Sequence, residues 1–236
     1  MSDKFQLKRP DSLSKIAEDQ IRNGIVNGTY RLGEKLQEVR LSDAMGISKT
    51  PIREALAALN LRGLVQIFPQ RGAFVFSLSQ DEVEQLCRYR MILEAAAMDA
   101  AMDENPTGLI KELTDIVAKM ADAREANAFE RYLALDADFH NAFFKYGGND
   151  YLRSGYQKVS DIFSTMRTHL SRRPERTAKS FAEHEAIVAH LRAGKVSSAR
   201  TVLRRQITRG ERSYSDLGGT DAGDTVKQNQ SPMVGK

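Results

Sequence analysis

Hydrophobic residues in the first third of the chain recur every three or four positions and then alternate with polar ones. The first pattern is typical of amphipathic helices, and the second is typical of strands. We expect helices over about 13–27, 39–44 and 48–61, then two short strands that flank a Pro-Gln-Arg-Gly loop at 69–72. Three helices and a β-hairpin predict a winged helix-turn-helix domain over 12–78.

From position 79 onward the alternating pattern disappears and only helical spacing remains. Asn-Pro, Gly-Gly-Asn-Asp, Arg-Arg-Pro and Ala-Gly-Lys breaks separate the helical stretches. This part predicts an all-α bundle over 79–214, and the chain as a whole is expected to be mainly α. The polar ends, 1–11 and 215–236, are expected to be a flexible tail and a disordered tail. The expected helices of the bundle are about 80–103, 108–124, 127–145, 149–171, 176–193 and 196–214.

Composition places the chain among ordinary globular proteins, with 41% hydrophobic and 28% charged residues. No apolar run approaches the roughly 20 residues of a membrane span. The first residues lack the apolar core of a signal peptide, so we expect a cytoplasmic protein. Cys87 is the only cysteine. It cannot form an internal disulfide, and its helical context indicates a packing residue.

Positive charge is concentrated near the amino end. Residues 1–78 contain 12 Lys and Arg against 8 Asp and Glu, whereas the remainder holds 23 of each. A phosphate-binding surface would use such an excess, although solvated surface alone can also produce it.

The segment LSDAMGISKTPIREAL at 41–56 carries the most specific signal in the chain. Gly46 allows a tight turn between two helices, and Ser48 or Thr50 can cap the second one. The buried stripe of that second helix is expected to be Ile52, Leu56 and Leu59.

The polar residues at the start of this second helix are left facing outward. In a helix-turn-helix this end enters the major groove of DNA. The guanidinium group of Arg53 can donate two parallel hydrogen bonds, which match the two acceptors of guanine, O6 and N7. Ser48, Lys49 and Thr50, with the free amides of the helix start, suit phosphate oxygens. A winged helix that binds protein is the alternative.

Residues 13–76 resemble the DNA-binding domain of the GntR family of bacterial transcription regulators, through GEKLQEVRLSDAMGISKTPIREALAALNLRGLV and the wing PQRGAFV. Two positions depart from the pattern: Leu32 replaces the usual proline, and Val39 replaces a basic residue of some relatives, a contact that Arg40 could supply. The resemblance implies DNA contacts by Arg40, Ser48, Lys49, Thr50 and Arg53, with Arg71 and Gly72 of the wing tip at the minor groove.

Polar residues interrupt the apolar stripes of the bundle at helical spacing. Arg90 points inward because it lies on the stripe formed by Val83, Leu86, Arg90, Leu93 and Ala97. Asp136 and His140 point inward because they lie on the stripe formed by Phe129, Leu133, Asp136, His140 and Phe143. His184 and Gln206 fall on the stripes of the last two helices. Such groups are costly in a core unless they meet each other, a metal or a ligand.

These inward residues allow several kinds of site. Asp136 and His140, with His184 from another helix, form a metal-ligating constellation. Two core histidines bonded to Asp136 are the structural alternative. Arg90 could hold a carboxylate with two hydrogen bonds, or it could form a salt bridge with a residue such as Asp136.

Residues 80–212 resemble the FCD ligand-binding domain of the FadR subfamily of GntR regulators, through YRMILEAAA, DADFHNAFFKYGGN and EHEAIVAHLRAGK. The resemblance implies that Asp136, His140 and His184 hold a divalent metal, zinc or nickel, that helps to bind a carboxylate effector. Arg90 and Gln206 are the residues that we expect to contact this effector. Gln206 stands where the family has a third metal-binding His. An amide is a poorer ligand than imidazole, so we expect weaker metal binding, a different metal or none.

The sequence therefore predicts a regulator, not an enzyme. We expect a homodimeric repressor that binds a roughly palindromic DNA operator and responds to a small organic acid. One alternative is a metal-free regulator that senses a longer acyl ligand. The other is a metal-dependent hydrolase, for which no nucleophile or general base is evident near the three candidate ligands.

Overall fold

The computed structural model describes residues 11–170 and 174–218 of the chain. These residues form two compact units that divide between Phe76 and Ser77, and each unit is described by itself. Most of the predicted tails, namely 1–10 and 219–236, lies outside the described residues. The last helix continues to Gly218, so the stretch 215–218 is helical where the sequence predicted disorder.

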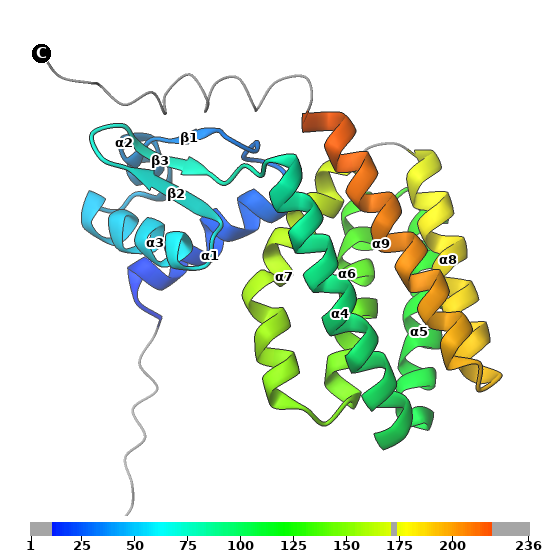
Figure 1. Cartoon of the computed structure of the whole chain (residues 1–236). Helices are drawn as coiled ribbons and strands as arrows, with labels where there is room; N and C mark the ends of the chain where they lie inside the picture. Colours follow the sequence, from blue (N-terminus) through cyan, green and yellow to red (C-terminus); the bar gives the residue numbers. More distant parts are fainter. Residues whose placement is uncertain (1–10, 171–173, 219–236) are drawn as a thin grey trace, which may run out of the picture. The chain divides into compact units, whose positions relative to one another are not determined.

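In the N-terminal unit, residues 11–76 form three helices and three strands. Their arrangement is drawn in Figure 1. Ile21 and Ile25 of the first helix and Ile52 and Leu59 of the third are fully buried, which is why these helices pack against each other. The predicted stripe of the third helix, Ile52, Leu56 and Leu59, is thereby confirmed. The elements are α1 (Leu13–Val26), β1 (Lys35–Leu36), α2 (Glu38–Met45), α3 (Lys49–Leu61), β2 (Val65–Phe68) and β3 (Gly72–Val75).

The wing is a three-stranded antiparallel sheet in the order β1-β3-β2. Val65 lies opposite Val75 in the predicted hairpin, and Lys35 lies opposite Phe74 on its other edge. The sequence prediction of two strands was therefore incomplete. A strand of two residues is too short to show alternation, and β1 exists because the backbone of β3 has a free edge to pair with.

The C-terminal unit is a bundle of six helices among the described residues, as predicted. In Figure 1, α4 runs between α7 and α9, and it packs against both as well as against α6. None of the helices in the described ranges has the length and apolar character of a membrane span. The helices are α4 (Gln80–Glu104), α5 (Pro106–Glu125), α6 (Phe129–Tyr146), α7 (Asp150–Leu170), α8 (Pro174–Arg192) and α9 (Val196–Gly218).

The ends of the bundle helices follow local chemistry. Ser79 and Glu82 form a reciprocal capping box at the start of α4. Asn105 ends α4 and caps α5, where Pro106 takes the first helical position. These side chains satisfy backbone donors that a helix start leaves unpaired.

The bundle core is largely the one the stripes predicted. Val83, Leu93 and Ala97 of α4 are buried, and so is Cys87. The prediction that Phe129 belongs to the core is wrong, because Phe129 is the first residue of α6 and is 36% exposed.

Candidate DNA-binding surface and buried polar cluster

The turn between α2 and α3 depends on a left-handed residue. Gly46 has φ = 65°, and its N–H reaches the carbonyls of Asp43 and Ser42 at the end of α2. Ser42 Oγ also donates to the Ile47 carbonyl at 2.5 Å. Ser48 then takes the extended conformation of an N-cap, without a side-chain cap bond of its own. The turn therefore presents the first residues of α3 to solvent.

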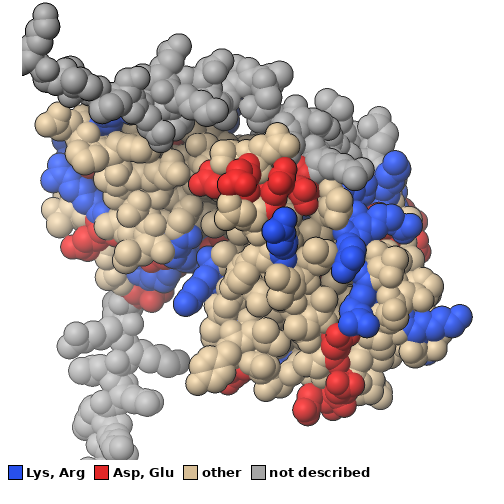
Figure 2. All heavy atoms as spheres, viewed as in Figure 1, with Lys and Arg blue, Asp and Glu red and all other residues tan. Residues whose placement is uncertain are grey.

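All seven residues predicted to contact DNA are exposed: Arg40, Ser48, Lys49, Thr50, Arg53, Arg71 and Gly72. Several Lys and Arg side chains are visible on this unit in Figure 2. Arg53 Nε donates to Glu38 Oε2 of α2 at 2.7 Å. The side chain of Arg53 nevertheless remains 66% exposed, so Glu38 orients the guanidinium without covering it.

The wing tip is a tight turn that contains Arg71. Gln70 and Gly72 have φ values of 62° and 97°, and Arg71 N–H closes the turn onto the Phe68 carbonyl at 3.1 Å. The guanidinium carbon of Arg71 lies 5.4 Å from the Phe68 ring centroid and 5.9 Å from that of Phe74. The two rings therefore hold the guanidinium group of Arg71 through cation–π contacts.

The C-terminal unit brings the five inward polar residues into its core. Arg90, Asp136, His140, His184 and Gln206 are each 8% exposed or less. One ligand atom from each of Asp136, His140 and His184 lies within 4.8 Å of the others. The stripe analysis thus located these residues, but it did not identify their partners.

Glu94, which the sequence analysis missed, is the partner of two of them. Its carboxylate accepts from Arg90 Nε at 2.6 Å and from His140 Nδ1 at 2.7 Å, and it is fully buried. The expected pairing of Arg90 or His140 with Asp136 is therefore wrong. The available signal was the spacing of Arg90 and Glu94, which at i and i+4 share one face of α4.

Asp136 instead pairs with Arg167 of α7, a second residue that the sequence analysis missed. Arg167 Nε lies 2.8 Å from Asp136 Oδ2. Arg167 Nη2 also donates to Ser164 Oγ at 3.0 Å on its own helix. The sequence separation of 31 positions gives no local signal for this pair, because the contact exists only once α6 and α7 pack together.

His184 lies between the aspartate and the amide. Its Nε2 is 3.5 Å from Asp136 Oδ1 and accepts from Gln206 Nε2 at 3.0 Å. Gln206 also donates to Ser180 Oγ at 3.3 Å. His184 Nδ1 and Gln206 Oε1 are buried without a hydrogen bond.

The ionisation of the cluster follows from burial and from the two arginines. Burial opposes charge on Glu94, but Arg90 and His140 outweigh it and hold the pKa of this carboxyl below its ordinary value. Burial opposes charge on Asp136 in the same way, and the guanidinium of Arg167 outweighs it and lowers the pKa of this carboxyl. Burial lowers the pKa of His140 and brings that of His184 to about 3. Near neutral pH the cluster therefore holds two carboxylates, two guanidinium groups and two neutral imidazoles.

The donor set fits a divalent metal. Glu94 accepts the proton of His140 Nδ1, which leaves Nε2 of that ring as a lone-pair donor. His184 is neutral and presents Nε2 to Asp136. One carboxylate and two imidazoles suit zinc or nickel, with Arg167 Nε as the present partner of Asp136 Oδ2.

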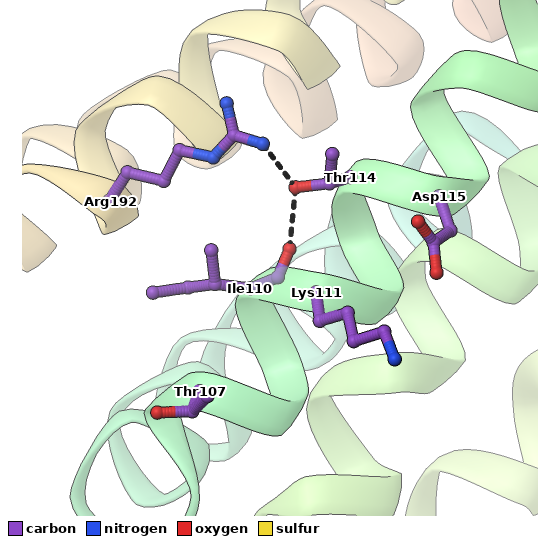
Figure 3. A pocket seen from close by; sticks show the side chains of 6 residues that line it. All are labelled: Thr107, Ile110, Lys111, Thr114, Asp115 and Arg192. Carbon is purple, nitrogen blue, oxygen red and sulfur yellow. Dashed lines mark hydrogen bonds between the residues drawn. The ribbon is translucent and has the colours of Figure 1, made fainter.

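A surface hollow of about 420 Å³ lies apart from this cluster, between α5 and α8 (Figure 3). Arg192 Nη2 donates to Thr114 Oγ1 at 2.7 Å, and Thr114 donates to the Ile110 carbonyl at 2.6 Å. Arg192, Thr114 and the Ile110 carbonyl thus already satisfy one another. None of the buried polar cluster lines this hollow.

Comparison with known proteins identifies both units. The N-terminal unit matches the gntR family of bacterial regulatory proteins over 13–75, and the C-terminal unit matches the FCD domain over 85–209. The HTH-type transcriptional regulator YdhC of Bacillus subtilis strain 168 is 28% identical over 164 residues, which cover 68% of this chain and 72% of YdhC. The gluconate operon transcriptional repressor of the same organism is 22% identical over 174 residues, 72% of this chain and 71% of the repressor.

A solved structure of a GntR transcriptional regulator from Rhodococcus sp. RHA1 has the same fold, with a TM-score of 0.75 at 20% identity. The match covers 88% of this chain and 99% of the other. The chain therefore belongs to the GntR family and is a DNA-binding transcription regulator with an FCD domain, not an enzyme.

Proposed function

We propose that this regulator is a homodimeric repressor that reads a roughly palindromic operator through α3 and the wing, and that a small organic acid bound in the FCD domain controls its affinity for DNA. The observation that carries the DNA-reading part is the division of α3 into two faces. Ile52, Leu56 and Leu59 are buried, whereas Lys49, Thr50 and Arg53 at the helix start are exposed.

Arg53 is proposed as the base-reading residue. Glu38 engages Nε and leaves the two terminal nitrogens of the guanidinium as a planar fork. A fork of this kind can donate to O6 and N7 of guanine, and such a bidentate contact is worth about 1–3 kcal/mol of discrimination.

The residues around Arg53 are proposed to hold the DNA backbone. Ser48 and Thr50 offer hydroxyl groups, and the amides of Lys49 and Thr50 belong to the helix start, where donors lack helical partners. Lys49 and Arg40 add positive charge on the same unit. These contacts would fix the register of the protein on DNA without reading its sequence.

The wing tip is proposed to enter the minor groove. Arg71 stands on the aromatic pair of Phe68 and Phe74, so little conformational freedom is lost when it binds. Gly72 beside it has no side chain to obstruct the approach of a phosphate or sugar. Arginine is favoured in a narrow minor groove because the potential there is negative.

The effector is proposed to be a carboxylate that binds at the buried polar cluster. Glu94 engages Nε of Arg90, so the rest of the guanidinium is available to a second anion. The amide of Gln206 is anchored to Ser180 and His184, with Oε1 left as an acceptor. An organic acid would offer partners to both groups.

Asp136, His140 and His184 are proposed to hold a divalent metal, zinc or nickel, in the effector-bound protein. When bound, such an ion supplies a Lewis-acid position for a carboxylate oxygen. Glu94 holds the neutral imidazole of His140 through Nδ1, whereas Gln206 would have to release His184 Nε2 before that nitrogen could bind the ion. Arg167 at Asp136 and the amide at 206 favour the other candidate, a regulator that senses an acyl ligand without metal.

Arg53→Ala tests the DNA-reading proposal. Operator fragments are first selected from genomic DNA with the wild-type protein, and affinities for operator and for scrambled DNA are then measured by fluorescence anisotropy. The variant should lose about tenfold to a hundredfold in operator affinity and much less on scrambled DNA.

Arg88→Ala is the matched control, because it removes an exposed arginine from the other unit. It should change neither affinity by more than about twofold, since it removes only one solvated charge. An equal loss by Arg53→Ala on both kinds of DNA would contradict a base-reading role for this residue.

A further inference from the structure

We infer that Arg167 is a built-in counter-ion of Asp136 that competes with a divalent metal for this carboxylate. The inference rests on the metal site proposed above. It adds that the chain itself lowers the metal affinity of that site through a residue of α7.

The first observation is the position of Arg167. Its Nε lies 2.8 Å from Asp136 Oδ2, and the two side chains are only 13% and 5% exposed. Oδ2 and Arg167 Nη1 are nevertheless buried without a well-aligned hydrogen bond. The pair is therefore held by charge more than by directional bonding, and a stronger ligand for Asp136 could displace the guanidinium.

The second observation is the charge balance of the cluster. Arg90 is matched by Glu94, and Asp136 is matched by Arg167. A divalent cation on Asp136 would place two further positive charges beside Arg167 in a buried region. Like charges at this separation repel strongly where water is excluded.

The third observation is the absence of a second free carboxylate among the described residues of the cluster. Glu94 is occupied by Arg90 and His140, so it cannot turn to the metal without leaving both. Gln206 contributes an amide with no charge. Asp136 is thus the single anionic ligand, and whatever neutralises Asp136 governs metal binding.

Displacement of Arg167 would not leave it without an anchor. Its Nη2 bonds to Ser164 Oγ on the same helix at 3.0 Å. Metal binding would therefore exchange one cation for another at Asp136, while Arg167 keeps its attachment to α7.

Zinc affinity of the full-length protein tests this inference. Wild type and Arg167→Gln are stripped with EDTA, and zinc binding is measured by competition with a chromophoric chelator in the absence of DNA. Arg167→Gln should bind zinc at least about tenfold more tightly, because the competing charge is gone. Arg167→Lys, which keeps the charge, should remain within about threefold of wild type.

Arg200→Gln is the matched control for net charge, since it removes an arginine that is 46% exposed and pairs with Asp99. It should leave zinc affinity within about twofold of wild type because exposed charges are screened. Adding Asp136→Asn to Arg167→Gln should abolish the tight site, and tight binding that survives this change would overturn the assignment to Asp136.

Thermal denaturation supplies an independent readout. In EDTA the melting temperature of Arg167→Gln should fall below that of wild type, because Asp136 is left buried without a counter-ion, and zinc should reverse this order. If Arg167→Gln unfolds in EDTA, refolding with zinc supports the inference and failure to refold contradicts it. Equal zinc affinity in wild type and Arg167→Gln would overturn it. Loss of operator binding by all variants in EDTA would instead count against the proposed function.

Discussion

Glu94 joins two polar residues that the helical pattern had placed in the core. Its two carboxylate oxygens accept from Arg90 and His140, and both bonds lie where water is excluded. A buried charge of this kind is tolerated because it is paired on both sides. The same contact decides which nitrogen of His140 carries the proton, and it leaves Nε2 of that ring as a lone-pair donor.

Glu94→Gln should destabilise the C-terminal unit by about 3 kcal/mol or more, because it leaves the guanidinium of Arg90 buried without an opposite charge. Urea denaturation followed by circular dichroism measures the loss. Glu84→Gln is the control on the same helix, since Glu84 is exposed. It should change the free energy of unfolding by less than about 0.5 kcal/mol. A similar effect of both substitutions would show that the ion pair adds nothing beyond a surface charge.

The elements of the N-terminal unit are held in register by turns, not by long strands. Gly46 ends α2 in a left-handed conformation, and this turn sets the direction in which α3 begins. An added side chain would meet no atom within 4 Å, so only the backbone conformation opposes substitution at this position. The wing depends in the same way on Gln70 and Gly72, whose positive φ values turn the chain between β2 and β3.

Gly46→Ala should cost about 1 kcal/mol in the unfolding of the N-terminal unit, because alanine resists positive φ. Gly46→Asn is the matched variant, since asparagine tolerates the left-handed region, and it should cost less than half as much. Thermal unfolding of both proteins measures the difference. If alanine and asparagine destabilise equally, the cost comes from something other than the backbone angle.

On the scale of the whole molecule, the excess of positive charge belongs to one unit and the buried ion pairs belong to the other. The first 78 residues carry the entire excess of positive charge, and the remainder is balanced. The excess of basic residues is thus on the unit that matches the gntR family, whereas Arg90 and Asp136 of the FCD unit are paired with Glu94 and Arg167 inside the bundle. This arrangement favours DNA binding by one unit and ligand binding by the other.

If two copies of α3 bind one operator, their spacing should be fixed by the dimer. Inserting five base pairs between the half-sites turns one of them to the opposite face of DNA, about half a helical turn away. Affinity should then fall by at least about tenfold, as measured by anisotropy on otherwise identical duplexes. The control places the same five base pairs outside both half-sites. Unchanged affinity for the internal insertion would indicate that each half-site is bound by an independent monomer.

The sequence by itself determined the elements and the inward-facing positions of this protein. Helical spacing records which side of each helix is buried, so the six helices of the bundle and the burial of Arg90, Asp136, His140 and His184 could be predicted one helix at a time. The turn glycine and the outward face of α3 were predictable for the same local reason.

Only the tertiary structure decided the partners of the buried residues. Arg167 of α7 forms an ion pair with Asp136 of α6, and Glu94 bonds to His140, which is 46 positions away in the sequence. Strand β1 forms because β3 offers it an edge. Such contacts leave no period in the sequence, because they depend on how separate elements pack. The ion pairs that balance the cluster therefore became visible only when the helices were brought together.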